Sequence, residues 1–307
     1  MSAFSNLPFE ERSAVFDKAM ALRRTGLGYK RIMKRIFSES AIKIPQSTLA
    51  YWCKNKIALL SGENQFVQKA TPELCYVLGT MFGDASISFG KAKSEYRLRL
   101  ESIDEDFAEK FSKCISKLLN KPRDYAVCKT KRGMHSTQAR SKQLYFFIKS
   151  IKEDFEKAKP FIEEYPAEFI QGLADSEGCP AISVRRKLSC GIGVAYSTNY
   201  ALLEYSSKLL KLEFGIYCFL KLHKMKGAAD SKINDRIIKR TKNIYVLGVR
   251  KRESVKKFYE KINFSIARKK IKLSDALSLL ESYSAVEAAR LWRKMYLKVR
   301  NRWIKEN

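Results

Sequence analysis

Histidine is scarce in this chain, and so are the usual signs of a zinc-binding or disulfide-rich protein. The 307 residues include only His135 and His223, which argues against zinc hydrolases and against nucleases with a histidine base. The seven cysteines are scattered and form no C-x-x-C pair, so we expect reduced thiols. If the chain is an enzyme, carboxylates and a metal ion must carry its chemistry.

Long apolar runs are also missing. No stretch approaches the roughly 20 apolar residues of a membrane-spanning helix. The first residues carry Glu10 and Glu11 and lack the apolar core of a signal peptide. The sequence therefore predicts an intracellular protein, in the cytoplasm or nucleoid, with no membrane partner.

Acidic residues are greatly outnumbered. The 60 Lys and Arg residues face 32 Asp and Glu, for a formal net charge of +28 at pH 7. Such an excess favours a polyanionic partner such as DNA or RNA. The hydrophobic content of 45% is nevertheless sufficient for a sizeable core.

One mostly apolar segment occurs twice, at residues 74–86 (LCYVLGTMFGDAS) and 169–178 (FIQGLADSEG). The two copies lie about one small α+β unit apart, so the repeat indicates two related halves. Aligning the copies matches Gly79 with Gly172, Gly83 with Ser176, and Asp84 with Glu177.

Each copy predicts a buried helix that ends at a carboxylate. Gly79 and Gly83 are four residues apart and share one helix face. Glycine inside a helix costs up to about 1 kcal/mol, so glycine at matching positions, here Gly79 and Gly172, indicates close backbone approach. We expect the two helices to pack on each other, which brings Asp84 and Glu177 together at one end.

Two carboxylates at adjoining helix ends are unfavourable by themselves. Each opposes its helix dipole by roughly 0.3–1 kcal/mol, and the pair repel each other. A divalent cation between them removes both effects, and hard oxygen ligands suit magnesium. Asp84 and Glu177 are therefore candidate metal ligands.

At this point the sequence resembles the single-chain LAGLIDADG homing endonucleases, over roughly residues 70–275. The resemblance implies an α+β fold of two pseudo-symmetric αββαββα halves, with two antiparallel DNA-binding sheets and the motif helices at the interface between the halves. It also implies two or three Mg²⁺ ions held between the acids and the scissile phosphates. The implied catalytic and metal-binding residues are Asp84 and Glu177, with the carbonyl groups of Gly83 and Ser176 as further metal ligands.

The sequence departs from the family pattern in two places. Ala85 stands where glycine is usual, and Cys179-Pro180 follow the second motif where a polar or basic residue often lies. The segment 264–270 (FSIARKK) resembles the basic segment that re-enters the active site in this family. Arg268 or Lys269 is thus a candidate catalytic residue at the scissile phosphate, and a basic loop on a phosphate or in solvent is the alternative.

The N-terminal region resembles, in part, a helix-turn-helix DNA-binding module. Residues 26–32 and 47–52 carry this resemblance, although the link between the two helices is longer than the usual tight turn. A three-helix cap docked on the body is the alternative. If the module binds a major groove, the residues that face it are Gln46, Ser47, Thr48, Tyr51 and Lys54.

Period-two alternation predicts strands whose polar face is strongly basic. Twisted β-ribbons of this kind fit the major groove of DNA, where Arg and Lys pair with guanine edges or phosphates and Gln pairs with adenine. The DNA-binding candidates on the strands are Arg97, Arg99, Lys129, Lys131, Gln138, Arg140, Arg185, Lys187, Lys221 and His223.

The predicted organisation has five parts. They are an all-α domain (1–60), a linker (61–71), a first half (72–163), a second half (164–282) and a basic amphipathic C-terminal helix (283–307).

The functional hypothesis is site-specific cleavage of double-stranded DNA by a monomer. The resemblance implies metal-dependent double-strand breaks with short 3′ overhangs at a long target, in the service of intron or intein mobility. Two alternatives on the same fold remain open, a DNA-binding regulator that does not cut and an RNA maturase that binds intron RNA.

Overall fold

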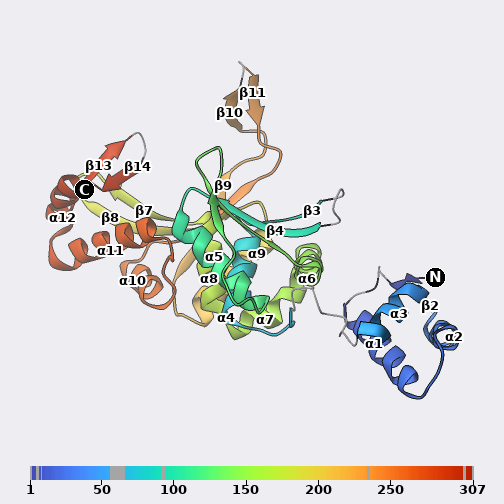
Figure 1. The fold of residues 1–307 in the computed structure, drawn as a ribbon. Helices are drawn as coiled ribbons and strands as arrows, with labels where there is room; N and C mark the ends of the chain where they lie inside the picture. Colours follow the sequence, from blue (N-terminus) through green and yellow to red (C-terminus); the bar gives the residue numbers. More distant parts are fainter. Residues whose placement is uncertain are drawn as a thin grey trace.

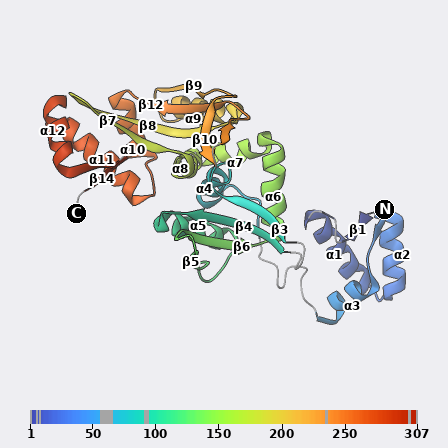
Figure 2. The same cartoon turned by 90° about the horizontal axis from the view of Figure 1, so that it is seen from above.

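Two antiparallel four-stranded sheets and the helices packed on them form the body of the molecule (Figure 1 and Figure 2). The computed structural model describes residues 2–4, 7, 9–55, 66–90, 95–233, 236–299 and 302–305.

The first half follows the predicted αββαββα order, and its strands lie in the order β3-β4-β6-β5. Its elements are α4 (Pro72–Met81), β3 (Ser86–Gly90), β4 (Glu95–Ser102), α5 (Glu105–Leu118), β5 (Val127–Lys129), β6 (His135–Arg140) and α6 (Lys142–Glu153). A 3-10 turn, η3 (Phe155–Ala158), and a short helix, α7 (Lys159–Glu164), lead into the second half.

The second half repeats the order, with strands arranged β7-β8-β12-β9. Between β9 and β12 an additional two-stranded hairpin, β10 (Ala229–Ile233) and β11 (Arg236–Lys239), extends from the sheet. The repeated elements are α8 (Pro166–Glu177), β7 (Cys179–Val184), β8 (Leu188–Ser197), α9 (Tyr200–Leu212), β9 (Cys218–Lys224), β12 (Ile244–Val249) and α10 (Arg252–Lys261).

One hydrophobic core runs through both halves. Leu98 and Leu100 alternate with arginines on β4, so the apolar row faces the helices. Phe107, Phe111 and Ile115 recur every four residues on α5 and are fully or almost fully buried. The predicted antiparallel sheets with helices on one side are confirmed.

The N-terminal residues have a separate small core around Trp52. Three helices are present there, α1 (Phe9–Arg24), α2 (Tyr29–Ser40) and α3 (Gln46–Asn55). The link from α2 to α3 contains β2 (Ile42–Lys43), which pairs in parallel with β1 (Ser2–Ala3). The helix-turn-helix assignment of this region stays a prediction. Of the predicted linker, residues 61–65 lie outside the described residues.

The C-terminal residues differ from the predicted continuous helix. After α11 (Ala267–Ser282) and α12 (Ala285–Met295), β13 (Tyr296–Val299) pairs with β14 (Arg302–Lys305). Trp292 stacks on Tyr296 with ring centroids 4.1 Å apart, and Trp303 returns to the same cluster from β14. The hairpin therefore returns Trp303 to the buried Trp292 and Tyr296, whereas Val299, which helical spacing had assigned to the same stripe, is 50% exposed.

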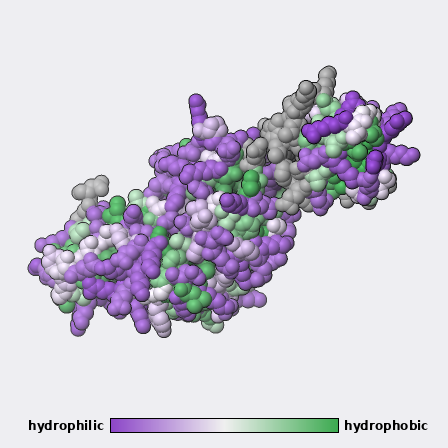
Figure 3. All heavy atoms as spheres, turned by 90° about the horizontal axis from the view of Figure 1, so that it is seen from below, coloured by the Kyte–Doolittle hydropathy of each residue, from purple (hydrophilic) through white to green (hydrophobic). Residues whose placement is uncertain are grey.

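Hydrophilic side chains cover most of the face seen in Figure 3, and apolar ones form small separate patches. Across the described ranges, no helix combines the length and the apolar character needed to cross a membrane.

Candidate active site at the interface of the two halves

The interface between the halves is formed by α4 and α8, which pack backbone to backbone. Thr71 caps α4 by accepting a hydrogen bond from the Leu74 amide at 3.1 Å. A Cβ atom on Gly79 would overlap the Phe169 carbonyl oxygen, and one on Gly172 would overlap the Tyr76 carbonyl oxygen. The close approach predicted from the matching glycines is therefore present.

The same packing brings the two motif acids to one end of the interface. Glu177 is the last residue of α8, whereas α4 ends at Met81 and Asp84 follows in the turn. A Cβ atom on Gly83 would overlap Ser176 and would lie only 3.1 Å from the Glu177 Cγ atom. The turn that carries Asp84 therefore lies against the end of α8.

At this end of the interface, two carboxylates of like charge lie near one ammonium group of opposite charge. Burial raises the pKa of Asp84, and the Asp104 carboxylate raises it further. Burial, and then the negative charge of Asp84, raise the pKa of Glu177. The ammonium group of Lys269 opposes these effects at both acids. The site is therefore short of positive charge in the free protein.

Lys269 is held at the carboxyl end of α8. It lies in the first turn of α11 and is 6% exposed. Its Nζ atom donates to the Asp175 carbonyl oxygen at 2.5 Å and to the Ala174 carbonyl oxygen at 3.2 Å. Burial lowers the pKa of Lys269, and the Asp175 carboxylate opposes that shift. Of the two basic candidates, Lys269 is the one that acts electrostatically on both acids.

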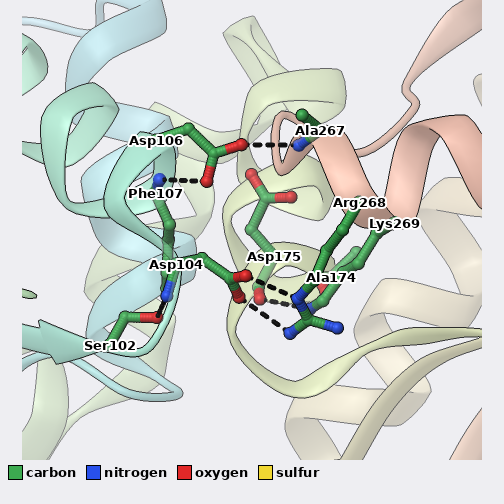
Figure 4. Close-up of polar contacts among 9 residues, drawn as sticks. All are labelled: Ser102, Asp104, Asp106, Phe107, Ala174, Asp175, Ala267, Arg268 and Lys269. Carbon is green, nitrogen blue, oxygen red and sulfur yellow. Dashed lines mark hydrogen bonds and ion pairs between the residues drawn. The ribbon is translucent and has the colours of Figure 1, made fainter. Parts of the chain in front are cut away.

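Arg268 points to a different partner. Its guanidinium forms a two-pronged ion pair with Asp104, with Nε–Oδ1 and Nη2–Oδ2 distances of 2.5 and 2.7 Å (Figure 4). Asp104 precedes α5 as expected of an N-cap, but its side chain makes no capping bond. Its carboxylate is directed to Arg268 instead, and Asp106 accepts a hydrogen bond from the Ala267 amide at 2.6 Å. These contacts fasten α11 to the first half.

The donor set suits a hard divalent cation. Asp84 and Glu177 supply two carboxylates whose mutual repulsion a cation would offset. Among the described residues no group of three or more His, Cys, Asp or Glu side chains gathers at one point. Magnesium retains several water ligands and needs few from protein, so two carboxylates are a sufficient protein contribution.

The open face of the first sheet brings together four of the predicted DNA-binding residues. Arg97 stands opposite Arg140 across β4 and β6, and Arg99 stands opposite Gln138. Ion pairs with Glu95 and Glu101 hold the arginines along the sheet: Arg97 and Arg140 with Glu95, and Arg99 with Glu101.

Lys221 and His223 lie on the open face of the second sheet. Cys218 on the same strand, β9, forms a hydrogen bond with Ser207 of α9, so Cys218 faces the helices. Because side chains alternate along a strand, the odd-numbered positions of β9 face outward. The His223 ring lies 5.0 Å from that of Tyr196. Burial and the positive charges of Lys224, Lys221 and Arg240 lower the pKa of His223, so at neutral pH it is a hydrogen-bonding group more than a cation.

The remaining four candidates do not lie on an open strand face as predicted. Lys129 pairs with His135, and this register puts both on the helix-covered face, where His135 contacts Glu105 of α5. A shift of one residue in the strand register moves every side chain to the opposite face of the sheet. The alternation of residues alone did not define the register of this strand. Lys131 lies in the turn between β5 and β6, and Arg185 and Lys187 lie in the turn between β7 and β8.

The N-terminal candidates lie on α3. Gln46, Ser47 and Tyr51 are exposed, and Thr48 is half-buried. The Lys54 side chain lies outside the described residues. The polar face of α3 is therefore accessible, as a recognition helix would require.

Sequence reasoning missed the polar groups that support the site. Asp175 is 1% exposed and accepts hydrogen bonds from Tyr76 and Ser265. The sequence did contain an indication of this role, because a carboxylate two residues before Glu177 in a buried helix requires hydrogen-bond partners. Those partners come from α4 and from the segment just before α11, which no spacing rule connects.

Comparisons with known proteins agree with this architecture. A family model described as a LAGLIDADG-like domain matches residues 164–263. The uncharacterized protein MJ0398 of Methanocaldococcus jannaschii is 32% identical over 266 residues, which span 86% of this chain and 93% of that protein. The uncharacterized protein MJ0314 of the same organism is 27% identical over 194 residues, 61% of this chain and 70% of its own length.

Two solved structures are also similar. The homing endonuclease I-DmoI in complex with DNA and Mn matches with a TM-score of 0.41 and 22% identity, over 63% of this chain and 97% of that one. The LAGLIDADG meganuclease I-AabMI bound to uncleaved DNA matches with a TM-score of 0.46 and 13% identity, over 73% of this chain and 97% of that one.

Proposed function

This chain belongs to the LAGLIDADG-like family, and on that basis we propose that it is a site-specific, metal-dependent DNA endonuclease. The observation that carries the proposal is the convergence of Asp84, Glu177 and Lys269 at one end of the α4–α8 interface. Desolvated like charges are unfavourable for a purely structural or binding role, whereas a hydrolytic site gains from them once a cation is bound.

In this proposal Asp84 and Glu177 hold magnesium ions, with the carbonyl groups of Gly83 and Ser176 as further ligands. The bound metal supplies a more acidic water molecule and stabilises negative charge on the phosphate. Lys269 adds a fixed positive charge beside the acids and restrains the end of α8. Catalysis then needs no histidine base, in agreement with the low histidine content.

The two basic sheet faces would hold the DNA duplex across the acid pair. Arg97, Arg99, Gln138 and Arg140 would contact one half of the target, and Lys221 and His223 the other. Membership of the family implies that the two scissile phosphates would face each other across the minor groove. It also implies short 3′ overhangs at a long site, as in the homing of mobile introns.

The N-terminal helices provide an additional DNA contact in this proposal. Gln46, Ser47 and Tyr51 give α3 an accessible polar face, and the recognition helix of a helix-turn-helix module uses such a face in the major groove. The turn residues Lys131, Arg185 and Lys187 would contact phosphates outside the grooves.

A selection on random DNA tests the proposal. The full-length protein is incubated with a randomised duplex library with and without Mg²⁺, and the new DNA ends are sequenced. Magnesium-dependent ends at one long motif, with short 3′ overhangs, are the expected result. Recovery of a bound motif without any new ends would contradict cleavage and identify a DNA-binding regulator.

Replacing Lys269 by Met is expected to reduce the cleavage rate about 10²-fold, because it removes an ammonium group that acts on both acids. DNA affinity, measured with Ca²⁺ in place of Mg²⁺, should change little. Lys270→Met is the matched control, since Lys270 is the exposed neighbour on the same helix. Equal rates for the two variants would remove Lys269 from the mechanism.

A further inference from the structure

Asp175 is a buried carboxylate for which the proposed reaction has no direct use. It lies two residues before Glu177 on α8, so it points away from the acid pair. It accepts three hydrogen bonds, from the Ser265 amide at 2.9 Å, the Ser265 hydroxyl at 2.5 Å and the Tyr76 hydroxyl at 2.9 Å. The three donors come from two elements remote in sequence, α4 and the segment before α11.

The segment that Asp175 holds is the one that delivers Lys269. Ser265 lies four residues before Lys269, with Phe264 and Ile266 on either side buried in the core. The first turn of α11 begins directly after this anchor, and it extends Lys269 back to the Ala174 and Asp175 carbonyl oxygens. The Asp175 carboxylate and the main-chain carbonyl groups of α8 therefore hold the same short segment at two points. Figure 4 shows the main-chain contact.

In the described part of the first half, the corresponding positions form no such anchor. The motif alignment places Phe82 opposite Asp175. Phe82 packs its ring against Phe155 of η3 and Phe169 of α8, which is an apolar contact without the hydrogen bonds that Asp175 makes. Lys157 and Lys159, which lie at the corresponding point of the first half, pair with Asp154 and Glu156. The hydrogen-bonded anchor thus occurs where the lysine beside the acids occurs.

We propose that Asp175 is a positioning residue for DNA cleavage, which holds the start of α11 so that Lys269 stays beside Asp84 and Glu177. The inference rests on the proposed function only in its catalytic consequence. The positional claim concerns the free protein and can be measured without DNA or metal.

Amine labelling tests the positional claim. The wild-type protein and the Asp175→Asn and Ser265→Ala variants are treated with an acetylating reagent, and modification of Lys269 is followed by peptide mass spectrometry. In both variants Lys269 should react about fivefold faster or more, because each loses a hydrogen bond between Ser265 and Asp175 that closes the segment. Lys270 should react at an unchanged rate and serves as the internal reference.

Ser274→Ala is the matched control. Ser274 lies on α11 and accepts a hydrogen bond from the Tyr259 hydroxyl of α10 at 3.2 Å, so it contacts neither Asp175 nor Ser265 through this bond. It should leave the reactivity of Lys269 as in the wild type. If Asp175→Asn and Ser265→Ala keep wild-type melting behaviour and wild-type Lys269 reactivity, the proposal is wrong. Should Asp175→Asn fail to fold, Ser265→Ala decides alone.

The catalytic consequence is tested with the selected DNA target. Both variants should lower kcat about 10–100-fold, as expected when a group that orients an active-site residue is removed. KM and DNA affinity should stay within about twofold, because a positioning defect acts on the reaction step. A rise in KM at unchanged kcat would overturn the assignment. If the wild-type protein does not cut DNA, the proposed function is wrong. The labelling experiment still tests the positional claim, because it needs no DNA cleavage.

Discussion

Replacing Glu177 by Gln is expected to lower magnesium-dependent DNA cleavage by about 10³-fold or more. The change removes one of the two carboxylates that converge at the helix interface, and charge stabilisation by a bound metal accounts for several kcal/mol of such a barrier. Asp84→Asn should have a similar effect. DNA affinity should be preserved, because in the proposed complex the acids would face the phosphates and add only repulsion in the absence of metal.

The measurement is the single-turnover rate on the selected target, with Glu164→Gln as control. Glu164 is an exposed acid at the end of α7, so the same chemical change there should leave the rate unaltered. Wild-type cleavage by Glu177→Gln would contradict the proposed mechanism.

The same substitution should stabilise the metal-free protein at neutral pH. The pKa of Glu177 is raised in the folded state by burial and by Asp84, so the folded protein binds the proton more tightly than the unfolded chain. This group therefore favours folding below its unfolded pKa, and that contribution is lost as the pH rises through the higher folded pKa. With EDTA present, Glu177→Gln should melt above the wild type at pH 7.5, and the difference should shrink near pH 4. Added Mg²⁺ should raise the melting temperature of the wild type only.

Gly79→Ala is expected to produce the largest loss of stability, about 3 kcal/mol. The new Cβ atom would overlap the Phe169 carbonyl oxygen and lie 2.7 Å from the Leu173 amide nitrogen. Both are backbone atoms of α8, so no side-chain rotation can relieve the clash and the helices must separate. Because the acids lie at the end of this interface, cleavage should fall with stability.

Thermal unfolding checks this expectation, and the melting temperature should fall by about 10 °C. Gly90→Ala is the control, since its Cβ would make only ordinary contacts, at 3.4 Å or more, with the flexible Arg97 side chain. Should Gly79→Ala melt within about 2 °C of the wild type, α4 and α8 would not be in backbone contact.

Several features follow from the sequence because they depend on local periodicity. The duplicated motif predicted two helices in contact, since glycine at matching positions of two helices costs stability unless their backbones approach closely. Alternation on β4 separated Leu98 and Leu100 from Arg97 and Arg99 without ambiguity. The net charge indicated a polyanionic partner, because it needs no fold to be counted.

The alternation of apolar and polar residues was insufficient to predict which face a side chain occupies where the strands are short. β5 has three residues, and its register with β6 places Lys129 on the helix-covered face. At the C-terminus, helical spacing agreed with a continuous stripe, yet Trp303 reaches Trp292 through a hairpin. A short periodic pattern fits more than one way of burying the same residues, and tertiary packing selects among them.

The acid pair was determined by sequence alone, and its surroundings were decided only by tertiary structure. Asp84 and Glu177 belong to a repeat that any alignment of the chain with itself reveals. Lys269 and not Arg268 acts on the acid pair because Arg268 pairs with Asp104, which lies 164 residues away in the sequence. The anchor at Asp175 likewise depends on Ser265, 90 residues away. Hydrogen bonds between residues so far apart in the sequence cannot be predicted from spacing, because they are set by tertiary packing and not by the local path of the chain.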